Sequence, residues 1–93
     1  MKKYNLQLND LKNRYEYLLD QQNRAYIEFT THDHIWTLTH TIVPSAYEGQ
    51  GIASALTRDV LDEALRQGVK IRVMCSYISH WIERHPQYQD LLA

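Results

Sequence analysis

Residues 48–53 read EGQGIA, and the chain changes there from a strand pattern to a helix pattern. Apolar residues alternate with polar ones before this stretch and recur with helical spacing after it. Gly49 and Gly51 carry no side chain, so the backbone N–H groups around them can converge on an anion at the N-terminus of the following helix. This geometry suits a pyrophosphate group. A tight turn that binds nothing is the alternative, because two glycines alone also allow one.

The helix that follows should begin at residue 52 and end at Gly68, because glycine commonly follows the last helical turn. Its apolar stripe contains Ile52, Leu56, Val60, Leu61, Ala64 and Leu65. A strand is expected at residues 69–73, where apolar and charged residues alternate. A strand, a helix and a strand in this order favour a crossover connection that brings two parallel strands together.

Alternating patterns earlier in the chain predict four strands, at residues 4–8, 15–19, 25–29 and 34–43. A second helix should follow the fifth strand, capped by Ser76 or Ser79 and ended by His85-Pro86. The predicted fold class is α/β, of the α+β type: a mixed, mostly antiparallel sheet of about five strands with two helices, in the order β-β-β-β-α-β-α. Because 93 residues are too few for two cores, one domain spanning residues 1–93 is expected.

The fourth predicted strand ends at a proline. Strict alternation would place Trp36, Leu38, His40 and Ile42 on one face and the intervening threonines on the other. Pro44 has no backbone N–H and keeps the preceding residue extended, so strand pairing should stop or splay there. The sequence therefore predicts a gap in the sheet close to the glycine stretch.

The charge balance argues against several classes of partner. Ten Lys and Arg stand against eleven Asp and Glu, without a basic stripe, so nucleic-acid binding is not expected. Apolar runs are far shorter than the ~20 residues of a membrane span, and the start lacks an apolar signal segment, which predicts a cytoplasmic protein with no membrane partner. No metal site is expected, because the adjacent residues of His32-Asp33-His34 would point in different directions.

Two segments together resemble the acetyl-CoA loop of the GNAT acetyltransferase superfamily: residues 40–44, HTIVP, and residues 49–53, GQGIA. The loop usually reads Arg or Gln, any two residues, Gly, any residue, and Gly or Ala, and Gly51 and Ala53 match its last two fixed positions. The chain is more closely similar to the small, single-domain GNAT-like branch. That resemblance covers roughly residues 24–92 and includes residues 75–77 (CSY), 81–82 (WI), 84–86 (RHP) and Tyr88.

The resemblance implies that the cofactor is acetyl-CoA, or coenzyme A. Backbone atoms of Ile42 and Val43 would pair with its pantetheine arm. The residues implied around its pyrophosphate are Gly49, Gln50, Gly51, Ile52, Ala53 and Ser54. One departure from the pattern is Glu48, which stands where the family usually has Arg or Gln and would place a carboxylate beside the phosphates.

Cys75 is the single cysteine of the chain and cannot form an internal disulfide. If the fifth strand ends near Cys75 and a helix begins at Ser76, the thiol lies at a helix N-terminus, a setting that increases the thiolate fraction of a cysteine. The matching cysteine of the small GNAT-like branch lies close to the acetyl thioester, so the resemblance implies that Cys75 is the nucleophile. Two alternatives stay open: a small buried apolar side chain, and direct attack by the substrate amine.

Two further side chains are candidates for proton transfer. His40 shares its predicted face with Leu38, just before the splayed strand end, where it is either a general base or a buried histidine with a hydrogen bond. Tyr77 lies beside Cys75 and is a candidate donor to the departing thiolate; packing with its hydroxyl at the surface is the other interpretation.

The leading functional hypothesis is an N-acetyltransferase that passes acetyl from acetyl-CoA to an unidentified amine. Only a loop or one turn fits between Leu8 and Tyr15, so the acceptor side should be open. An open side favours a protein or peptide amine, or a partner chain that completes the pocket. The alternatives are a coenzyme A-binding module with little or no catalytic activity and a purely structural interaction domain.

Overall fold

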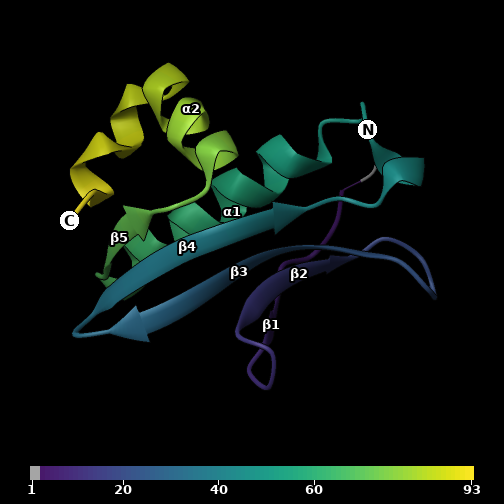
Figure 1. Cartoon of the computed structure of the whole chain (residues 1–93), viewed down its shortest axis with the longest axis horizontal. Helices are drawn as coiled ribbons and strands as arrows, with labels where there is room; N and C mark the ends of the chain where they lie inside the picture. The colour runs from purple at the N-terminus through teal and green to yellow at the C-terminus, as the bar shows by residue number, and fades with distance from the viewer. Residues whose placement is uncertain (1–2) are drawn as a thin grey trace.

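The computed structural model describes residues 3–93, which form one five-stranded sheet with helices packed on it (Figure 1). The strands lie side by side in chain order. In sequence the elements are β1 (Gln7–Asn9), β2 (Arg14–Leu18), β3 (Arg24–His32), β4 (Ile35–Ile42), η1 (Ser45–Tyr47), α1 (Ile52–Gln67), β5 (Lys70–Val73), α2 (Ser76–Arg84) and η2 (Pro86–Leu91), where η marks a 3₁₀ helix. The predicted mixed α+β class and the order of strands and α-helices are confirmed.

The first four strands form an antiparallel meander, and β5 joins it in parallel beside β4. The turn between β3 and β4 consists of Asp33 and His34, which have φ values of 52° and 62°. Two consecutive positive φ values are typical of the tight hairpin turn whose twist matches that of the strands. The parallel pairing that the strand-helix-strand pattern predicted is confirmed, with α1 as the crossover.

A β-bulge divides β4 into two halves. Glu28 of β3 lies opposite His40, but the next residue, Phe29, lies opposite Leu38, so Thr39 has no partner residue on β3. One extra residue in a strand reverses the facing of everything beyond it. Thr41 therefore faces the same way as Leu38. His40 and Ile42 point to the other face, and the prediction that they share a face with Leu38 is wrong.

The ladder between β4 and β5 ends at the same place. Leu38 pairs with Val73, the backbone N–H of Met74 donates to the Leu38 carbonyl at 2.9 Å, and no later residue of β4 pairs with β5. From there β4 runs on to Ile42, while the segment after β5 turns into α2 (Figure 1). The predicted gap thus exists, and it opens at the bulge, several residues before Pro44.

The core lies between the sheet and α1. Leu56, Val60, Leu61 and Ala64 of the helix are fully buried against the inward residues of β2, β3 and β5. Helix α1 ends at Gly68, whose φ of 73° is the left-handed conformation expected of a glycine cap. The glycine cap is confirmed, and so is the stripe except at Leu65, which is 52% exposed on the helix surface.

Helix α2 and η2 pack beside α1 through hydrogen bonds as well as apolar contacts. The indole N–H of Trp81 donates to the Ser54 hydroxyl at 2.8 Å, and the Tyr88 hydroxyl donates to the Asp62 carboxylate at 2.7 Å. Burial and this hydrogen bond raise the pKa of Tyr88 to about 12. The C-terminal residues are therefore hydrogen-bonded to α1 both in its first turn, at Ser54, and in its second half, at Asp62.

Two local expectations differ from the structure. The first strand spans only Gln7–Asn9, because the residues before it leave the edge of β2 and pack against the core instead. No serine side chain caps α2: its N-cap is Cys75, which makes no side-chain capping hydrogen bond. The predicted end of α2 at His85-Pro86 is confirmed, but Pro86 goes on to start η2 rather than an irregular tail.

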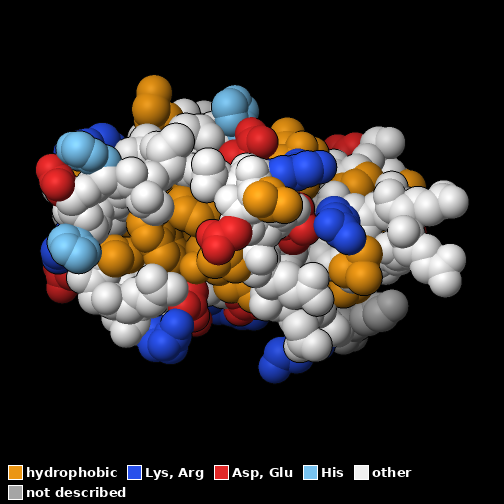
Figure 2. Space-filling model, turned by 90° about the horizontal axis from the view of Figure 1, so that it is seen from below, with side chains coloured by type: hydrophobic (Ala, Val, Ile, Leu, Met, Phe, Trp, Pro, Cys, Tyr) orange, Lys and Arg blue, Asp and Glu red, His pale blue; other side chains and the backbone are white. Residues whose placement is uncertain are grey.

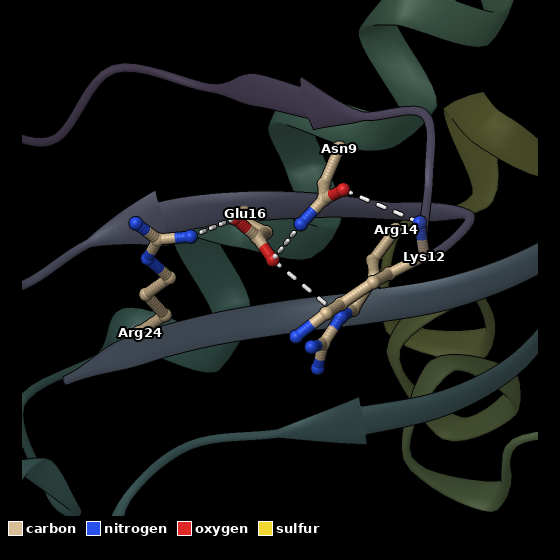
Figure 3. A network of polar contacts seen from close by, with 5 residues as sticks. All are labelled: Asn9, Lys12, Arg14, Glu16 and Arg24. Atoms are coloured by element: carbon tan, nitrogen blue, oxygen red, sulfur yellow. Dashed lines mark hydrogen bonds and ion pairs between the residues drawn. The ribbon is translucent and has the colours of Figure 1, made fainter.

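The sheet face away from α1 carries a polar network (Figure 3). Glu16, in the middle of β2, is only 3% exposed. Its carboxylate accepts from Asn9 and Arg24 at 3.1 Å each and lies 3.4 Å from the Arg14 guanidinium. Two arginines and an amide thus satisfy the buried carboxylate, as a charge removed from water requires.

Acidic and basic side chains are interspersed on the face seen in Figure 2, around a group of hydrophobic ones. Neither sign of charge dominates that face. Within residues 3–93, the helices are too short or too polar to span a bilayer.

Candidate functional site

A cavity of about 440 Å³ opens where β4 and β5 part. Its walls come from the second half of β4, the loop through η1, the first turn of α1 and the first turn of α2. They are lined by Thr41, Val43, Tyr47, Glu48, Gly49, Gly51, Ile52, Ala53, Ser54 and Tyr77. The glycine stretch and the gap in the sheet, two separate sequence predictions, therefore belong to one site.

The glycines give the loop its shape. Gly49 and Gly51 have φ values of 81° and 77°, in the left-handed region that side chains disfavour. Gly51 is the N-cap of α1, with no side chain to cap the helix. The wall of the cavity at this point is therefore backbone.

Backbone N–H groups are available along this wall. The first hydrogen bond of α1 runs from Ala55 N–H to the Gly51 carbonyl, at 3.1 Å. Within residues 3–93, no chain group accepts from the N–H groups of residues 49–54. Unpaired donors at the positive end of a helix dipole form an anion site, so this stretch fits the pyrophosphate predicted for it.

Six of the eight predicted cofactor residues line the cavity: Val43, Gly49, Gly51, Ile52, Ala53 and Ser54. Gln50 is exposed within the loop and lies outside the lining. Ile42 also lies outside it, because the bulge turns this side chain toward the face that carries Tyr26. Only backbone atoms of Ile42 were expected to contact a cofactor, and that expectation stays a prediction.

Cys75 lies beside the cavity at the start of α2. It is half-buried, and its sulfur is 3.4 Å from the hydroxyl oxygen of Thr41 on β4. This contact crosses the gap between the parted strands. Thr41 lines the cavity and Cys75 does not, so the thiol is next to a lining side chain rather than part of the lining itself.

Tyr77 reaches the cavity from the first turn of α2. Burial raises the pKa of its phenol, and a hydrogen bond with Ser54 opposes part of this effect. The phenol therefore carries its proton at neutral pH, as a donor to a departing thiolate requires. The structure thus brings together Cys75, Tyr77 and the glycine loop.

His40 does not join them. Its ring nitrogen Nδ1 lies 3.2 Å from a carboxylate oxygen of Glu28, and its side chain is 65% exposed on the opposite face of the sheet. Neither a buried histidine nor contact with the cavity is observed. The residue that the bulge turns toward the site instead is Thr41, which the sequence pattern did not single out.

Tyr47 is a second lining residue that sequence reasoning missed. Its hydroxyl donates to the carboxylate of Asp20 in the β2–β3 turn, and that carboxylate also accepts from Gln22 and Asn23. The contact joins the loop before α1 to a turn 27 positions earlier in the chain. Nothing local in either segment indicates this pairing.

We expect Tyr47→Phe to raise the pKa of Asp20 from about 2 toward its ordinary value of 3.8, because the Tyr47 hydroxyl is the largest cause of the lowered value. A carboxyl pKa that is lowered on folding stabilises the fold above its unfolded pKa, and this stabilisation is lost as the pH falls through about 2. An NMR titration of the carboxyl carbons measures the shift. Tyr26→Phe, on the other sheet face, is the control and should leave Asp20 unchanged.

Comparison with known proteins gives consistent matches. The model of the GCN5-related N-acetyl-transferase family matches residues 14–91. Protein NATD1 from chicken, mouse and human is 39% identical over 54 residues, which cover 58% of this chain and about half of each relative's own length. The solution structure of a GCN5-like protein from Staphylococcus aureus superposes with a TM-score of 0.75 at 26% identity, covering 100% of this chain and 91% of that one.

Proposed function

Because the chain belongs to the GCN5-related N-acetyltransferase family, we propose that it binds acetyl-CoA in the cavity between β4 and α2 and transfers the acetyl group to an amine. The observation that carries this proposal is the row of unpaired N–H groups at residues 49–54, at the N-terminus of a 16-residue helix. The cavity beside them continues to Thr41 and Tyr77.

Acetyl-CoA supplies an activated acetyl thioester at the end of an amide-containing arm that is attached to a pyrophosphate. The N–H groups of Gly49 to Ser54 hold the pyrophosphate. The free edge of β4, at Ile42 and Val43, pairs with the amides of the arm as a further strand would. The thioester then lies toward Thr41 and Tyr77.

The side chains near that end can exchange the acetyl group. The Cys75 sulfur forms the new bond to the acetyl carbon while the bond to the coenzyme A sulfur breaks. Tyr77 protonates the departing sulfur, and the proton lost by the Cys75 thiol restores the phenol, so the exchange is proton-neutral. Thr41 holds the thiol at the gap. An amine then takes the acetyl group from Cys75 as the bond to the Cys75 sulfur breaks, and the proton that the amine loses restores the thiol; direct attack on the thioester is the alternative route.

The acceptor side favours a large substrate. Residues 10–13, between β1 and β2, form a turn and no helix. A small acceptor needs walls on all sides, and this turn supplies none. We therefore propose a protein or peptide amine as acceptor, or a partner chain that completes the pocket.

The main alternative is a coenzyme A-binding module with little catalytic activity. Glu48 favours it, because this residue lines the cavity and its negative charge repels phosphates. Calorimetry with acetyl-CoA, followed by turnover against a peptide library, separates the possibilities. Binding with turnover supports the transferase, binding alone supports the module, and the absence of any heat or thermal shift contradicts both.

Replacing Glu48 tests the electrostatics of the site. We expect Glu48→Gln to tighten acetyl-CoA binding about 5-fold, because removing a like charge at the edge of a phosphate site is worth about 1 kcal/mol. Titration calorimetry at low salt measures this change. Glu83→Gln, an exposed substitution on α2, is the control for net charge, and an equal gain there would contradict the assignment.

A further inference from the structure

A second cavity, of about 210 Å³, adjoins the proposed acetyl-CoA site on the neighbouring side of α1. It is lined by Lys3, Tyr4, Tyr17, Ile52, Ala55, Arg58 and Asp59. Ile52 lines both cavities. Both cavities therefore border the first turn of the helix.

One wall of the second cavity is aromatic and apolar. The rings of Tyr4 and Tyr17 stack with centroids 5.5 Å apart and planes inclined by 29°. Ile52 and Ala55 form the adjoining wall from the helix. A flat heterocycle fits such a surface, because aromatic side chains bind bases by stacking and need no specific hydrogen bonds to do so.

The other part of the lining is cationic. Lys3 and Arg58 contribute two positive charges, and no carboxylate within residues 3–93 forms an ion pair with either. The carboxylate of Asp59 also lines the cavity, where it accepts the Tyr17 hydroxyl. Burial and the hydrogen bond to Asp59 raise the pKa of that hydroxyl, and the positive charge of Arg58 opposes the rise. The balance of charges is positive and suits an anion.

A ligand with both features is attached to the pyrophosphate of coenzyme A. Its nucleotide end consists of an adenine ring and a ribose that bears a 3′-phosphate. Arg58 lies six residues after Ile52 on α1, a rise of roughly 9 Å along the helix axis. An arginine side chain at that distance can reach a phosphate one sugar away from a pyrophosphate held at the helix N-terminus.

We propose that the second cavity binds the adenosine 3′-phosphate end of coenzyme A, with the adenine ring against Tyr4 and the 3′-phosphate on Arg58 and Lys3. The inference rests on the proposed function of the first cavity. It also accounts for Glu48. The family usually has Arg or Gln at this first loop position, and here Arg58, further along α1, supplies a positive charge instead.

The test compares coenzyme A with 3′-dephospho-coenzyme A, which differs only in the phosphate assigned to Arg58. Titration calorimetry is performed on the wild type, on Arg58→Gln and on Arg66→Gln, an exposed control on the same helix. We expect the wild type to bind coenzyme A about 10-fold more tightly than the dephospho form, since one charge-assisted contact is worth about this factor. Arg58→Gln should remove the preference, and Arg66→Gln should keep it.

Each outcome decides a different statement. A wild type that binds both ligands equally, or an Arg58→Gln variant that weakens both equally, overturns the assignment of the second cavity and leaves the first untouched. If neither ligand binds the wild type, the proposed function itself fails. Lys3→Gln provides a second measurement, with a smaller expected loss of about 3-fold confined to coenzyme A, because a flexible lysine makes a less directed contact.

Discussion

Leu56→Ala should lower the midpoint of thermal unfolding by roughly 15 °C. Leu56 is fully buried on the side of α1 that packs against the sheet. Removing its side chain leaves a cavity, at a cost of about 3 kcal/mol, and each 1 kcal/mol shifts the midpoint of a domain of this length by about 4 to 8 °C. That loss is a large part of the stability of a small domain.

Leu65→Ala is the matched control, because it removes the same atoms from the same helix at a position that is 52% exposed. Differential scanning calorimetry of both variants should show a fall of a few degrees at most for the control. Similar falls for the two substitutions would mean that helix propensity, rather than burial under the sheet, determines the effect.

Cys75→Ser should abolish the acetyl adduct that we expect on the wild type after incubation with acetyl-CoA. The chain has one cysteine, so a thioester adduct has a single possible site. A serine hydroxyl at neutral pH is a far weaker nucleophile than a cysteine thiol. Intact-mass spectrometry, with hydroxylamine to remove thioesters, detects the adduct.

The control is Ser76→Ala, which changes the exposed neighbouring residue and should keep the adduct. An adduct that persists in Cys75→Ser would place the acetyl group elsewhere. A wild type that shows no adduct but acetylates peptides would favour direct attack by the amine. In that case Cys75→Ser should retain most of the activity.

The parts of the fold that the sequence predicts are those that depend on neighbouring residues. The left-handed Gly51 and Gly68, the apolar stripe of α1 and the end of α2 before Pro86 all follow from local chain chemistry. That the glycine stretch binds an anion stays a prediction; what the structure adds is that its backbone N–H groups are unpaired within the described residues. Local pattern and position in the fold agree here.

The parts that could not be predicted depend on contacts between distant segments. The residues around Thr39 alternate regularly, and the bulge arises only from how β4 pairs with β3, so the sequence pattern placed His40 on the wrong face. The hydrogen bond between Tyr47 and Asp20 likewise joins two segments far apart in the chain, and the local sequence of neither segment indicates that they meet. For the same reason, Thr41 was missed as the residue in contact with Cys75.

The bulge at Thr39 absorbs the one residue by which β4 exceeds its partner strand. Leu38 and His40 lie opposite Phe29 and Glu28, which are consecutive in β3, so deleting Thr39 would keep both pairs and leave His40 outward. An engineer who wished to place a histidine opposite Cys75 would therefore substitute Thr41, whose hydroxyl oxygen is 3.4 Å from the sulfur, rather than shorten the strand. The side of the sheet that each of these residues occupies is fixed by its partner on β3, and the bulge lets β4 carry a spare residue without disturbing that match.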